Sequence, residues 1–403
     1  MFRARGQTDR YKIAIIGAGV QGLSLAYNLA KLGQNDVVVF EKSYLGSGAT
    51  TRCGGMIRAA YWNPELCNLL RESVQLWEQL SAELGYNVMF IHRPGFTVAS
   101  TEPELESYKD YVNMHHSCGL HTRILDSAET MKLVPYLNER EVTGAVFDPT
   151  AGIARHDAVV WAYARAAPRL GVSIHPQTEV QAIRVNDGCV RSVKTSQGEV
   201  QADIVVNAAG GYDKQVAQMA GVELPTVPQR LEATVTESIK PFLSYFRWYK
   251  GELYANQTSR GEIVAGVDSV YEVLSEPTAE LRCSLAHMRR VSQVLTSLFP
   301  SLERLAILRQ WAGLVSVSDD GCPILGPVPE VEGFILDCAW LVGFMAAPSA
   351  GQALAQSIVE QKMPKLIEPF KRSRFAEGKP ISHASVSAKF IRLARSNEVS
   401  LPT

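Results

Sequence analysis

The chain of 403 residues is long enough for two domains with separate cores, and its 46% hydrophobic and 20% charged residues are ordinary for a soluble globular protein. A formal net charge of −1 gives no electrostatic basis for a nucleic-acid or anionic-membrane partner. The 7 cysteines show no CxxC spacing, and no apolar stretch approaches the roughly 18 residues of a membrane span. Residues 1–11 lack the apolar core of a signal peptide, so we expect a cytoplasmic protein in a reducing compartment.

The first predicted elements form a dinucleotide-binding motif. A short apolar run at 13–16 predicts a buried strand, and a helix is expected over 24–32. Between them lie Gly17, Gly19 and Gly22, at the spacing that provides a tight turn, close approach to a pyrophosphate, and close packing of helix on strand. The N-terminus of the helix then faces the phosphates.

An acidic residue completes this motif. The next apolar run, 37–40, ends in Glu41, close to the roughly 20-residue spacing that such motifs show. A carboxylate there accepts a hydrogen bond from a ribose hydroxyl and repels a ribose phosphate. Strand, glycines, helix, strand and acid in this order predict a Rossmann-type domain for either NAD or FAD.

The middle of the chain contains helical and extended patterns in alternation. Apolar spacing, turn residues and β-branched or aromatic runs predict helices over 64–84, 104–118 and 277–299, a strand over 89–100, and antiparallel strands over 229–237, 244–256 and 262–267.

Two glycine-rich turns favour FAD over NAD. The apolar run 202–206 leads into Ala209 and Gly210, where small residues let the backbone approach the same ligand from its other side. Near the C-terminus, a turn at Gly343 opens a helix of small residues over 350–360. A flavin needs the positive end of a helix beside its pyrimidine ring, where negative charge collects on reduction. Ordinary loop glycines are the alternative for either turn alone.

The predicted fold is α/β, with two domains. A discontinuous Rossmann-type FAD-binding domain is expected beside a second, mostly antiparallel-sheet substrate domain. The tail is polar and basic, and we expect it either to trail in solvent or to pack on a partner chain. The predicted boundaries are 10–75, 150–225 and 310–368 for the FAD-binding domain, 76–149 and 226–309 for the substrate domain, and 369–403 for the tail.

These features resemble the amine-oxidising flavoproteins of the D-amino-acid oxidase and sarcosine oxidase superfamily. The resemblance is greatest to the β subunit of heterotetrameric sarcosine oxidase and to dehydrogenases acting on proline, hydroxyproline and opines. It is carried by the loop 45–58, by 313–326 and by the turn at 343–345. It implies FAD contacts for Gly17, Gly19, Gly22, Glu41, Lys42, Ser47, Thr50, Thr51, Arg52, Gly54, Gly55, Met56, Val180, Ala209, Gly210, Gly313, Gly343, Phe344 and Met345.

A second flavin is also implied by the resemblance. The segment 151–165 is similar to the part of the sarcosine oxidase β subunit whose histidine holds FMN covalently at the interface with the α subunit, and His156 falls on that histidine. A neutral imidazole can attack the 8-methyl carbon of an oxidised flavin. The alternative is a capping or solvent-facing histidine at the start of a helix from Asp157 to Arg165.

Four residues are candidates for the substrate site. The resemblance implies Arg58 as the clamp for the substrate carboxylate, with a surface or FAD-phosphate arginine as the alternative, and Tyr254 as a pocket tyrosine or a core strand tyrosine. Arg52 is the second clamp candidate but is expected on the cofactor, and Trp311 is expected to pack under the flavin sheet without a chemical role. Met345 occupies the position of a lysine that promotes reaction with oxygen in sarcosine-oxidising members, which favours a dehydrogenase.

No metal site is expected. His115, His116, Cys118 and His121 lie close together, but adjacent histidines on a helix point about 100° apart. We therefore expect them to form the exposed end of a polar helix.

The sequence thus predicts FAD-dependent oxidation of an N-substituted amino acid by hydride transfer to flavin N5. The chain would be the catalytic β subunit of a hetero-oligomeric dehydrogenase, with an α subunit and small subunits as partners. The alternatives are a sarcosine oxidase β subunit that uses oxygen, and a non-catalytic flavoprotein that serves in assembly or electron transfer.

Overall fold

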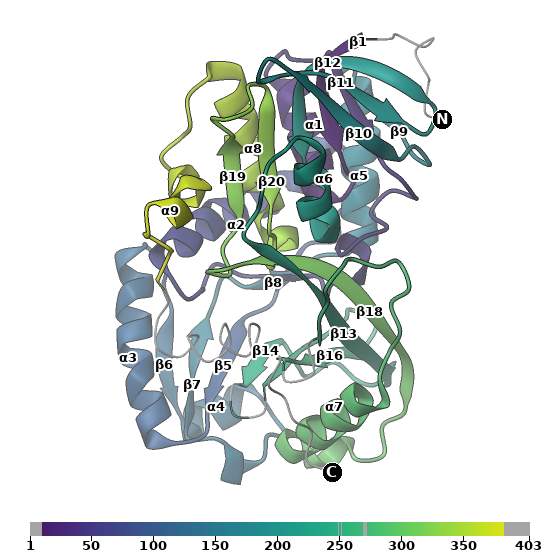
Figure 1. Ribbon diagram of the computed structural model, residues 1–403. Helices are drawn as coiled ribbons and strands as arrows, with labels where there is room; N and C mark the ends of the chain where they lie inside the picture. Colours follow the sequence, from purple (N-terminus) through teal and green to yellow (C-terminus); the bar gives the residue numbers. More distant parts are fainter. Residues whose placement is uncertain (1–9, 249, 251, 269–271, 383–403) are drawn as a thin grey trace.

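The computed structural model describes residues 10–248, 250, 252–268 and 272–382, so the residues before 10, considered above for a signal peptide, and the tail beyond 382 lie outside the described residues. Two β-sheets, each covered by helices, lie one above the other, and long strands run between the two halves (Figure 1). This arrangement confirms the α/β fold class. Within the described residues, no helix combines the length and apolar character that a membrane crossing requires.

The first sheet has a parallel core built from strands that are far apart in the sequence. β1 pairs in parallel with β2 and β12, and β12 pairs in parallel with β20. Ile13 and Ile15 pack in the core on one face and Ala14 on the other, so the later part of β1 is apolar on both faces. The strands are β1 (Arg10–Ile16), β2 (Val37–Phe40), β9 (Ser173–His175), β10 (Val180–Asn186), β11 (Cys189–Thr195), β12 (Gly198–Asn207), β19 (Ile324–Pro327) and β20 (Phe334–Cys338).

Helices of small and apolar residues cover this sheet. The closest pair is α1 and α8, where Ser24 Oγ donates to the Ala347 carbonyl over 2.8 Å and a Cβ at Gly351 would lie 2.4 Å from that hydroxyl. The helices are α1 (Val20–Lys31), α2 (Pro64–Leu84), α5 (His156–Arg169), α6 (Asp213–Met219), α8 (Gly343–Glu360) and α9 (Ser373–Ala376).

The second sheet has the order β17-β13-β16-β15-β14-β5-β7-β6, with β18 also paired to β13. It is mostly antiparallel, except that β14 runs parallel to β5, which the sequence patterns did not predict. The strands are β5 (Gly95–Ala99), β6 (Arg123–Asp126), β7 (Gly144–Asp148), β13 (Thr226–Ser238), β14 (Tyr245–Trp248), β15 (Leu253–Gln257), β16 (Glu262–Val267), β17 (Glu272–Val273) and β18 (Ile307–Ser318).

One face of this second sheet carries the apolar core, and the other faces the first sheet. Phe246, Leu253 and Ala265 pack against Val291 and Leu295 of α7 (Leu285–Leu298). Helices α3 (Glu102–Ser117) and α4 (Ser127–Leu133) complete this half. A small sheet of β3 (Met56–Ile57), β8 (Gly152–Ile153) and β4 (Ile91–His92) lies beside the junction.

Several predicted elements need correction. The helix predicted over 64–84 is confirmed, but the one predicted over 277–299 begins only at Leu285, after the capping Ser284. The strand predicted over 244–256 is two strands with a turn between them, because the chain reverses between Trp248 and Leu253.

Some of the predicted domain boundaries fall within continuous elements, whereas those at 149/150 and 225/226 fall between elements. Helix α2 passes through the boundary at 75/76, and β13 and β18 form a long antiparallel ladder that joins both halves (Figure 1). The division into two domains therefore stays a prediction.

The first part of the tail packs on its own chain, contrary to expectation. Buried Arg374 binds the carboxylate of Asp320 through Nε at 2.7 Å and through a second nitrogen at 2.8 Å. The Ile381 amide donates to the same carboxylate at 3.0 Å. Residues 369–382 are thus anchored to the turn after β18.

Candidate functional site

The start of α1 is suited to an anion. The helix begins at Gly19 without a side-chain cap and without an acidic residue in its first turn. A Cβ at Gly17 or Gly22 would lie 2.4 Å or 2.1 Å from a carbonyl oxygen, whereas at Gly19 its nearest neighbour would be Thr50 Oγ1 at 3.3 Å. Packing within the protein therefore requires glycine at 17 and 22, whereas at Gly19 an added Cβ would meet only one side-chain hydroxyl, so the uncapped helix start stays approachable by an anion.

Glu41 is fixed at the end of β2. Its carboxylate accepts hydrogen bonds from the amides of Ala18 and Ser43 at 3.0 and 2.9 Å and from Ser47 Oγ at 3.2 Å. A carboxylate has about four acceptor positions, so one more donor, such as a ribose hydroxyl, can still be accommodated. Lys42 follows, with its ammonium over the ring of Tyr212.

Three more of the residues expected to contact FAD lie near the ends of β10 and β12. Val180 is buried in the apolar cluster under β1. Ala209 and Gly210 form the turn after β12, and Gly210 has φ +58° with nothing within 4 Å of an added Cβ. The turn can therefore approach a ligand closely.

The loop 45–58 is held between the two sheets. Thr50, Thr51 and Arg52 form one turn of 3₁₀ helix. Thr51 Oγ1 donates to the Gly46 carbonyl at 2.8 Å, and the Arg52 guanidinium donates to the Gly48 carbonyl at 2.9 Å.

Contacts from the second sheet hold the later part of this loop. Asn256 Nδ2 donates to the Gly54 carbonyl at 3.0 Å, and Trp311 Nε1 donates to the Arg52 carbonyl at 2.8 Å. A Cβ at Gly313 would lie 3.3 Å from Arg52 Cβ. A Cβ at Gly55 would lie 2.4 Å from the carbonyl oxygen of Ala154, the residue that follows β8. Met56 then pairs with β8. The faces of β15 and β18 that carry these contacts are thus directed at the expected cofactor loop.

The start of α8 is rigid and has no side-chain cap. Its first turn contains no acidic residue, so its positive end is available to a flavin. The Met345 carbonyl accepts hydrogen bonds from Ser73 Oγ at 2.6 Å and Trp77 Nε1 at 3.0 Å, and the Phe344 ring packs 5.3 Å from that of Trp77. The Gly343 carbonyl accepts a hydrogen bond from Gln21 at 2.7 Å.

Two buried oxygens beside this turn have no partner among the described residues. They are Gln21 Oε1 and Asp337 Oδ2. Burial raises the pKa of Asp337 to about 7, against the hydrogen bond that its other oxygen accepts from Trp340. Unsatisfied buried acceptors next to an uncapped helix fit a site that a bound group completes.

Arg58 lies in a buried aromatic environment. Its guanidinium lies 4.7 Å from the ring centroid of Tyr61 and 5.0 Å from that of Tyr245, and it donates to the Ala60 carbonyl at 3.0 Å. The side chain is 7% exposed, which contradicts the surface alternative. Because Tyr245 belongs to β14, Arg58 adjoins the same sheet face that contacts the cofactor loop.

Tyr254 lies on that face as well. Its hydroxyl donates to the Glu232 carbonyl at 3.1 Å, and its ring covers Gly266, where a Cβ would lie 2.2 Å from the hydroxyl. It is therefore directed toward the cofactor side, away from the α7 core.

An ion pair that the sequence analysis missed lies next to Tyr254. Arg247 is directly opposite Tyr254 in the β14–β15 ladder, and it pairs with Asp268 at the end of β16. Both side chains are at least 94% buried. A charged residue at 247, between Phe246 and Trp248, was the signal that could have revealed it.

His156 is the first residue of α5 and does not cap the helix. The cap position is Arg155, without a side-chain cap bond. The ring is half-buried, and His156 Nδ1 is a buried atom with no hydrogen-bond partner among the described residues. Burial lowers the pKa of His156, against the effect of Asp157, and Arg155 and Arg309 lower it further. The imidazole is therefore neutral at pH 7.

The expected exposed helix end at 115–121 is wrong for His115. This residue is fully buried, and its ring nitrogens contact the Tyr61 carbonyl at 3.0 Å and Thr122 Oγ1 at 3.1 Å. Burial lowers the pKa of His115 to about 4, so the ring is uncharged near neutral pH. It contacts the backbone of Tyr61, the residue whose ring lies beside Arg58. No cluster of three or more metal-ligating side chains is present among the residues that the structure describes.

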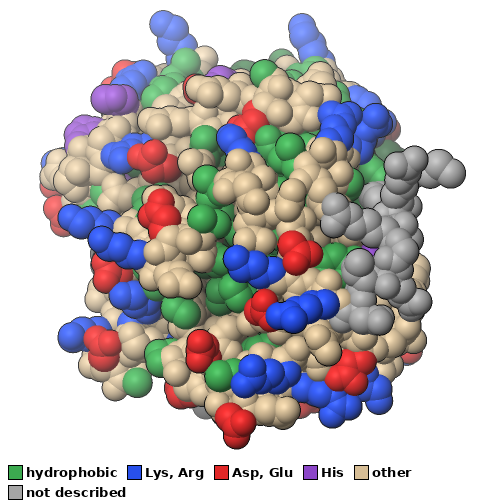
Figure 2. All heavy atoms as spheres, turned by 90° about the horizontal axis from the view of Figure 1, so that it is seen from above, with side chains coloured by type: hydrophobic (Ala, Val, Ile, Leu, Met, Phe, Trp, Pro, Cys, Tyr) green, Lys and Arg blue, Asp and Glu red, His purple; other side chains and the backbone are tan. Residues whose placement is uncertain are grey.

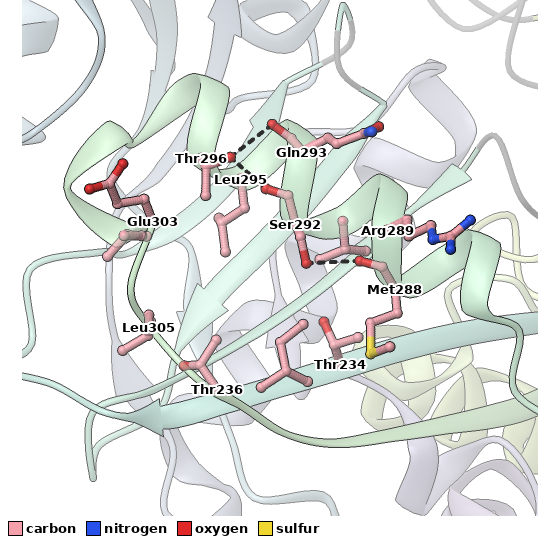
Figure 3. Close-up of a pocket in the computed structure, with 13 residues that line it drawn as sticks. Thr234, Thr236, Met288, Arg289, Ser292, Gln293, Leu295, Thr296, Glu303 and Leu305 are labelled. Carbon is pink, nitrogen blue, oxygen red and sulfur yellow. Dashed lines mark hydrogen bonds between the residues drawn. The ribbon is translucent and has the colours of Figure 1, made fainter.

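A groove of about 500 Å³ lies on the opposite face of the second sheet. It is bounded by α7, β13 and the start of β18, and its hydroxyls are occupied locally: Ser292 donates to the Met288 carbonyl at 2.9 Å (Figure 3). Thr234, which lines it, is on the α7 side of β13, so the groove is separate from Arg58 and Tyr254. The upper face of the molecule shows acidic and basic side chains interspersed (Figure 2).

The glycine turns, the uncapped starts of α1 and α8 and the buried Arg58 are together typical of an enzyme that binds FAD. The chain belongs to the family described as FAD dependent oxidoreductase, whose model matches residues 12–357.

Several known proteins resemble this chain over most of its length. The chain is 35% identical over 386 residues to the sarcosine oxidase subunit beta of Rhodobacter capsulatus, covering 93% of this chain and 91% of that protein. The L-proline dehydrogenase of P. horikoshii superposes with a TM-score of 0.87 at 30% identity, covering 93% of this chain and 100% of that one. The glycine oxidase of Geobacillus kaustophilus superposes with a TM-score of 0.82 at 26% identity, covering 91% of this chain and 99% of that one.

Proposed function

We propose that this chain is the catalytic, β-type subunit of a hetero-oligomeric dehydrogenase that oxidises a secondary, N-substituted amino acid. The observation that carries the proposal is the buried guanidinium of Arg58 between Tyr61 and Tyr245, on the wall that also contacts the cofactor loop. A guanidinium in such a site can bind a carboxylate through two parallel hydrogen bonds. Sarcosine and L-proline, named for two relatives, are both carboxylates with an alkylated nitrogen.

Bound FAD would supply the oxidising chemistry, namely acceptance of a hydride from the carbon next to the substrate nitrogen. The glycines at 17–22, the loop 45–58 and the start of α8 would hold this cofactor. Arg58 would fix the carboxylate, and Tyr254 and the aromatic wall would exclude water. A neutral amine needs no general base for this step, so position and electrostatics are what the chain supplies.

A dehydrogenase is favoured by Met345. A thioether at this position carries no charge and donates no hydrogen bond, so it cannot act as the oxygen-activating lysine of sarcosine-oxidising relatives. The 35% identity to a sarcosine oxidase subunit favours the second candidate, an oxygen-using sarcosine oxidase subunit.

Anaerobic mixing with sarcosine, proline and hydroxyproline tests both candidates. Bleaching of the flavin band followed by slow reoxidation in air is the expected result. Rapid reoxidation would favour the oxidase, and no bleaching with any of the three would overturn the proposal.

A partner chain and a second flavin are proposed at His156. Among the residues that the structure describes, His156 Nδ1 has no hydrogen-bond partner, and burial lowers the pKa of the ring, which favours the neutral imidazole that can attack an oxidised flavin. Trp161, on the same helix, is exposed, which suits a surface that another chain covers. In the native complex, about one FMN per FAD is expected, mapping to the His156 peptide if covalent and released in a His156→Asn variant. A complex with FAD alone would refute this part. The 7 cysteines are all free, consistent with a reducing cytoplasm.

A further inference from the structure

Two buried thiols lie against each other where α2 begins and α3 ends. Cys67 is in the first turns of α2, and Cys118 is the residue that ends α3. Cys67 Sγ lies 3.8 Å from Met114 Sδ, one helical turn before Cys118. Conversely, Cys118 Sγ lies 3.9 Å from the carbonyl oxygen of Pro64, one turn before Cys67. Each thiol thus contacts the helix that carries the other, and the two side chains are hydrogen-bonded to each other.

The two thiols differ in their chemistry. The hydrogen bond from Cys67 is the main reason why the pKa of Cys118 is lowered, against the effect of burial. Arg71, whose guanidinium donates to the Cys118 carbonyl, lowers this pKa further. The same contact between the thiols, together with burial, raises the pKa of Cys67. The pair therefore places a thiolate, which is the nucleophilic form, beside a thiol that keeps its proton.

Cys118 is the thiol that a small oxidant reaches first. It is 4% exposed and lies between exposed Ser117 and Gly119, whereas Cys67 is fully buried. A low-pKa cysteine near the surface with a second cysteine beside it is the arrangement of redox-sensitive pairs. Buried cysteines can also serve only as small apolar core residues, but that role gives no reason for one of them to be stabilised as a thiolate.

The Cys67 thiol also supports the wall around Arg58. Its Sγ lies 3.2 Å from the Tyr61 carbonyl oxygen, which His115 Nε2 contacts at 3.0 Å as well. The ring of Tyr61 lies 4.7 Å from the Arg58 guanidinium. In a disulfide, the Cys67 sulfur has no hydrogen to donate to this carbonyl, and it must lie about 2.05 Å from its partner sulfur. Oxidation of the pair would therefore remove one support of Tyr61 and shift the start of α2.

We propose that Cys67 and Cys118 form a reversible disulfide when the protein meets a peroxide, and that this modification weakens substrate binding at Arg58. The Cys118 thiolate attacks one oxygen of hydrogen peroxide, the O–O bond breaks, and hydroxide leaves, which gives a sulfenic acid. Cys67 then attacks the sulfenic sulfur, and its proton departs with the hydroxyl group as water. The two sulfurs lose two electrons, which the peroxide gains. The effect on the substrate rests on the proposed function, whereas formation of the disulfide does not.

Peroxide treatment of the full-length, FAD-containing protein tests the disulfide. After removal of hydrogen peroxide with catalase, free thiols are blocked with N-ethylmaleimide and the protein is digested without reduction. Mass spectrometry should identify a peptide that joins Cys67 to Cys118 and that dithiothreitol separates. Absence of this peptide would overturn the inference, most clearly if exposed Cys283 is oxidised under the same conditions, because accessibility alone would then decide which thiols react.

Anaerobic flavin bleaching by proline and by sarcosine measures the effect on the substrate. The oxidised protein should bind the amino acid at least about fivefold more weakly than the reduced protein, at the lower end of couplings between sites, and dithiothreitol should restore binding. Diamide, which converts thiols to disulfides, should act as peroxide does, which separates the disulfide from methionine oxidation. Cross-linked protein whose substrate dissociation constant stays within about twofold of the reduced value would overturn the link to Arg58.

Serine variants separate the thiol pair from other effects of peroxide. Cys118→Ser and Cys67→Ser should each form no cross-link and should bind substrate equally before and after treatment. The matched control Cys283→Ser should form the cross-link and lose binding as the wild-type protein does. Peroxide sensitivity retained in both Cys118→Ser and Cys67→Ser would overturn the inference and leave the proposed function intact. No bleaching of the untreated wild-type protein by any candidate amino acid would overturn the proposed function and the effect on the substrate, while mass spectrometry would still decide the disulfide.

Discussion

Replacing Arg58 by alanine should weaken amino-acid binding far more than FAD binding. Arg58 is 7% exposed, and its guanidinium lies 4.7 and 5.0 Å from two aromatic ring centroids. Water competes poorly in such a site, so the loss of a bidentate charged contact costs about 2–5 kcal/mol. This corresponds to roughly 30-fold to several thousand-fold in affinity. Arg58→Lys should recover only part, because an ammonium cannot form the planar fork.

The assay measures both ligands on the same proteins. The substrate dissociation constant comes from the concentration dependence of anaerobic flavin bleaching, and the FAD dissociation constant from flavin fluorescence. Arg165→Ala is the matched control, because Arg165 also stacks on a tyrosine, at 5.6 Å, but is exposed on α5. Equal losses for FAD and substrate would assign Arg58 to the cofactor phosphates. Unchanged substrate binding would refute the clamp altogether.

Three further predictions concern the cofactor, oxygen and the C-terminal anchor. Gly19→Val should abolish FAD binding, measured as the ratio of flavin to protein absorbance, since a branched side chain would occupy the pyrophosphate space; normal occupancy would contradict this. Met345→Lys should accelerate reoxidation by oxygen without a comparable change in the reductive half-reaction, and rapid oxygen reaction in the unmodified protein would show that Met345 is not decisive. Arg374→Met should lower the free energy of unfolding by about 3–5 kcal/mol in urea titrations, because the buried carboxylate of Asp320 loses its guanidinium partner. Burial opposes ionisation of Asp320, but Arg374 outweighs it and lowers the carboxyl pKa. The wild-type protein should therefore lose stability as the pH falls below about 4 and through this lowered pKa, and a flat profile there would argue against the anchor.

Local signals explain why some elements were predictable. Helix α2 begins and ends where the sequence predicts because Asn63 accepts a hydrogen bond from the Leu66 amide, Pro64 occupies the first turn, and Gly85 adopts φ +60° at the C-terminus. The sequence predicts α7 too long because proline is common at the first position of a helix, and Pro277 precedes the apolar pattern. The helix instead begins after Ser284, whose hydroxyl accepts a hydrogen bond from the His287 amide.

Contacts between distant residues explain what the sequence missed. The Arg247–Asp268 pair joins two strands that are not neighbours in the sheet, so no spacing along the chain predicts it. His115 was predictable in part, since it continues the buried stripe of Tyr108, Tyr111 and Val112 at helical spacing. Its hydrogen bond to Tyr61, from another segment, could only be seen in the fold.

The strand order of the first sheet has a consequence for synthesis on the ribosome. β1 is made first, but its neighbour β12 is complete only at Asn207, and β20 and α8 follow up to Glu360. At roughly 5–20 residues per second, the apolar surface of α1 waits about 20–70 s for the helix that covers it. We therefore expect the nascent chain to depend on chaperones until nearly its whole length has emerged, and a chain truncated before α8 to be degraded rather than to persist as a smaller flavoprotein.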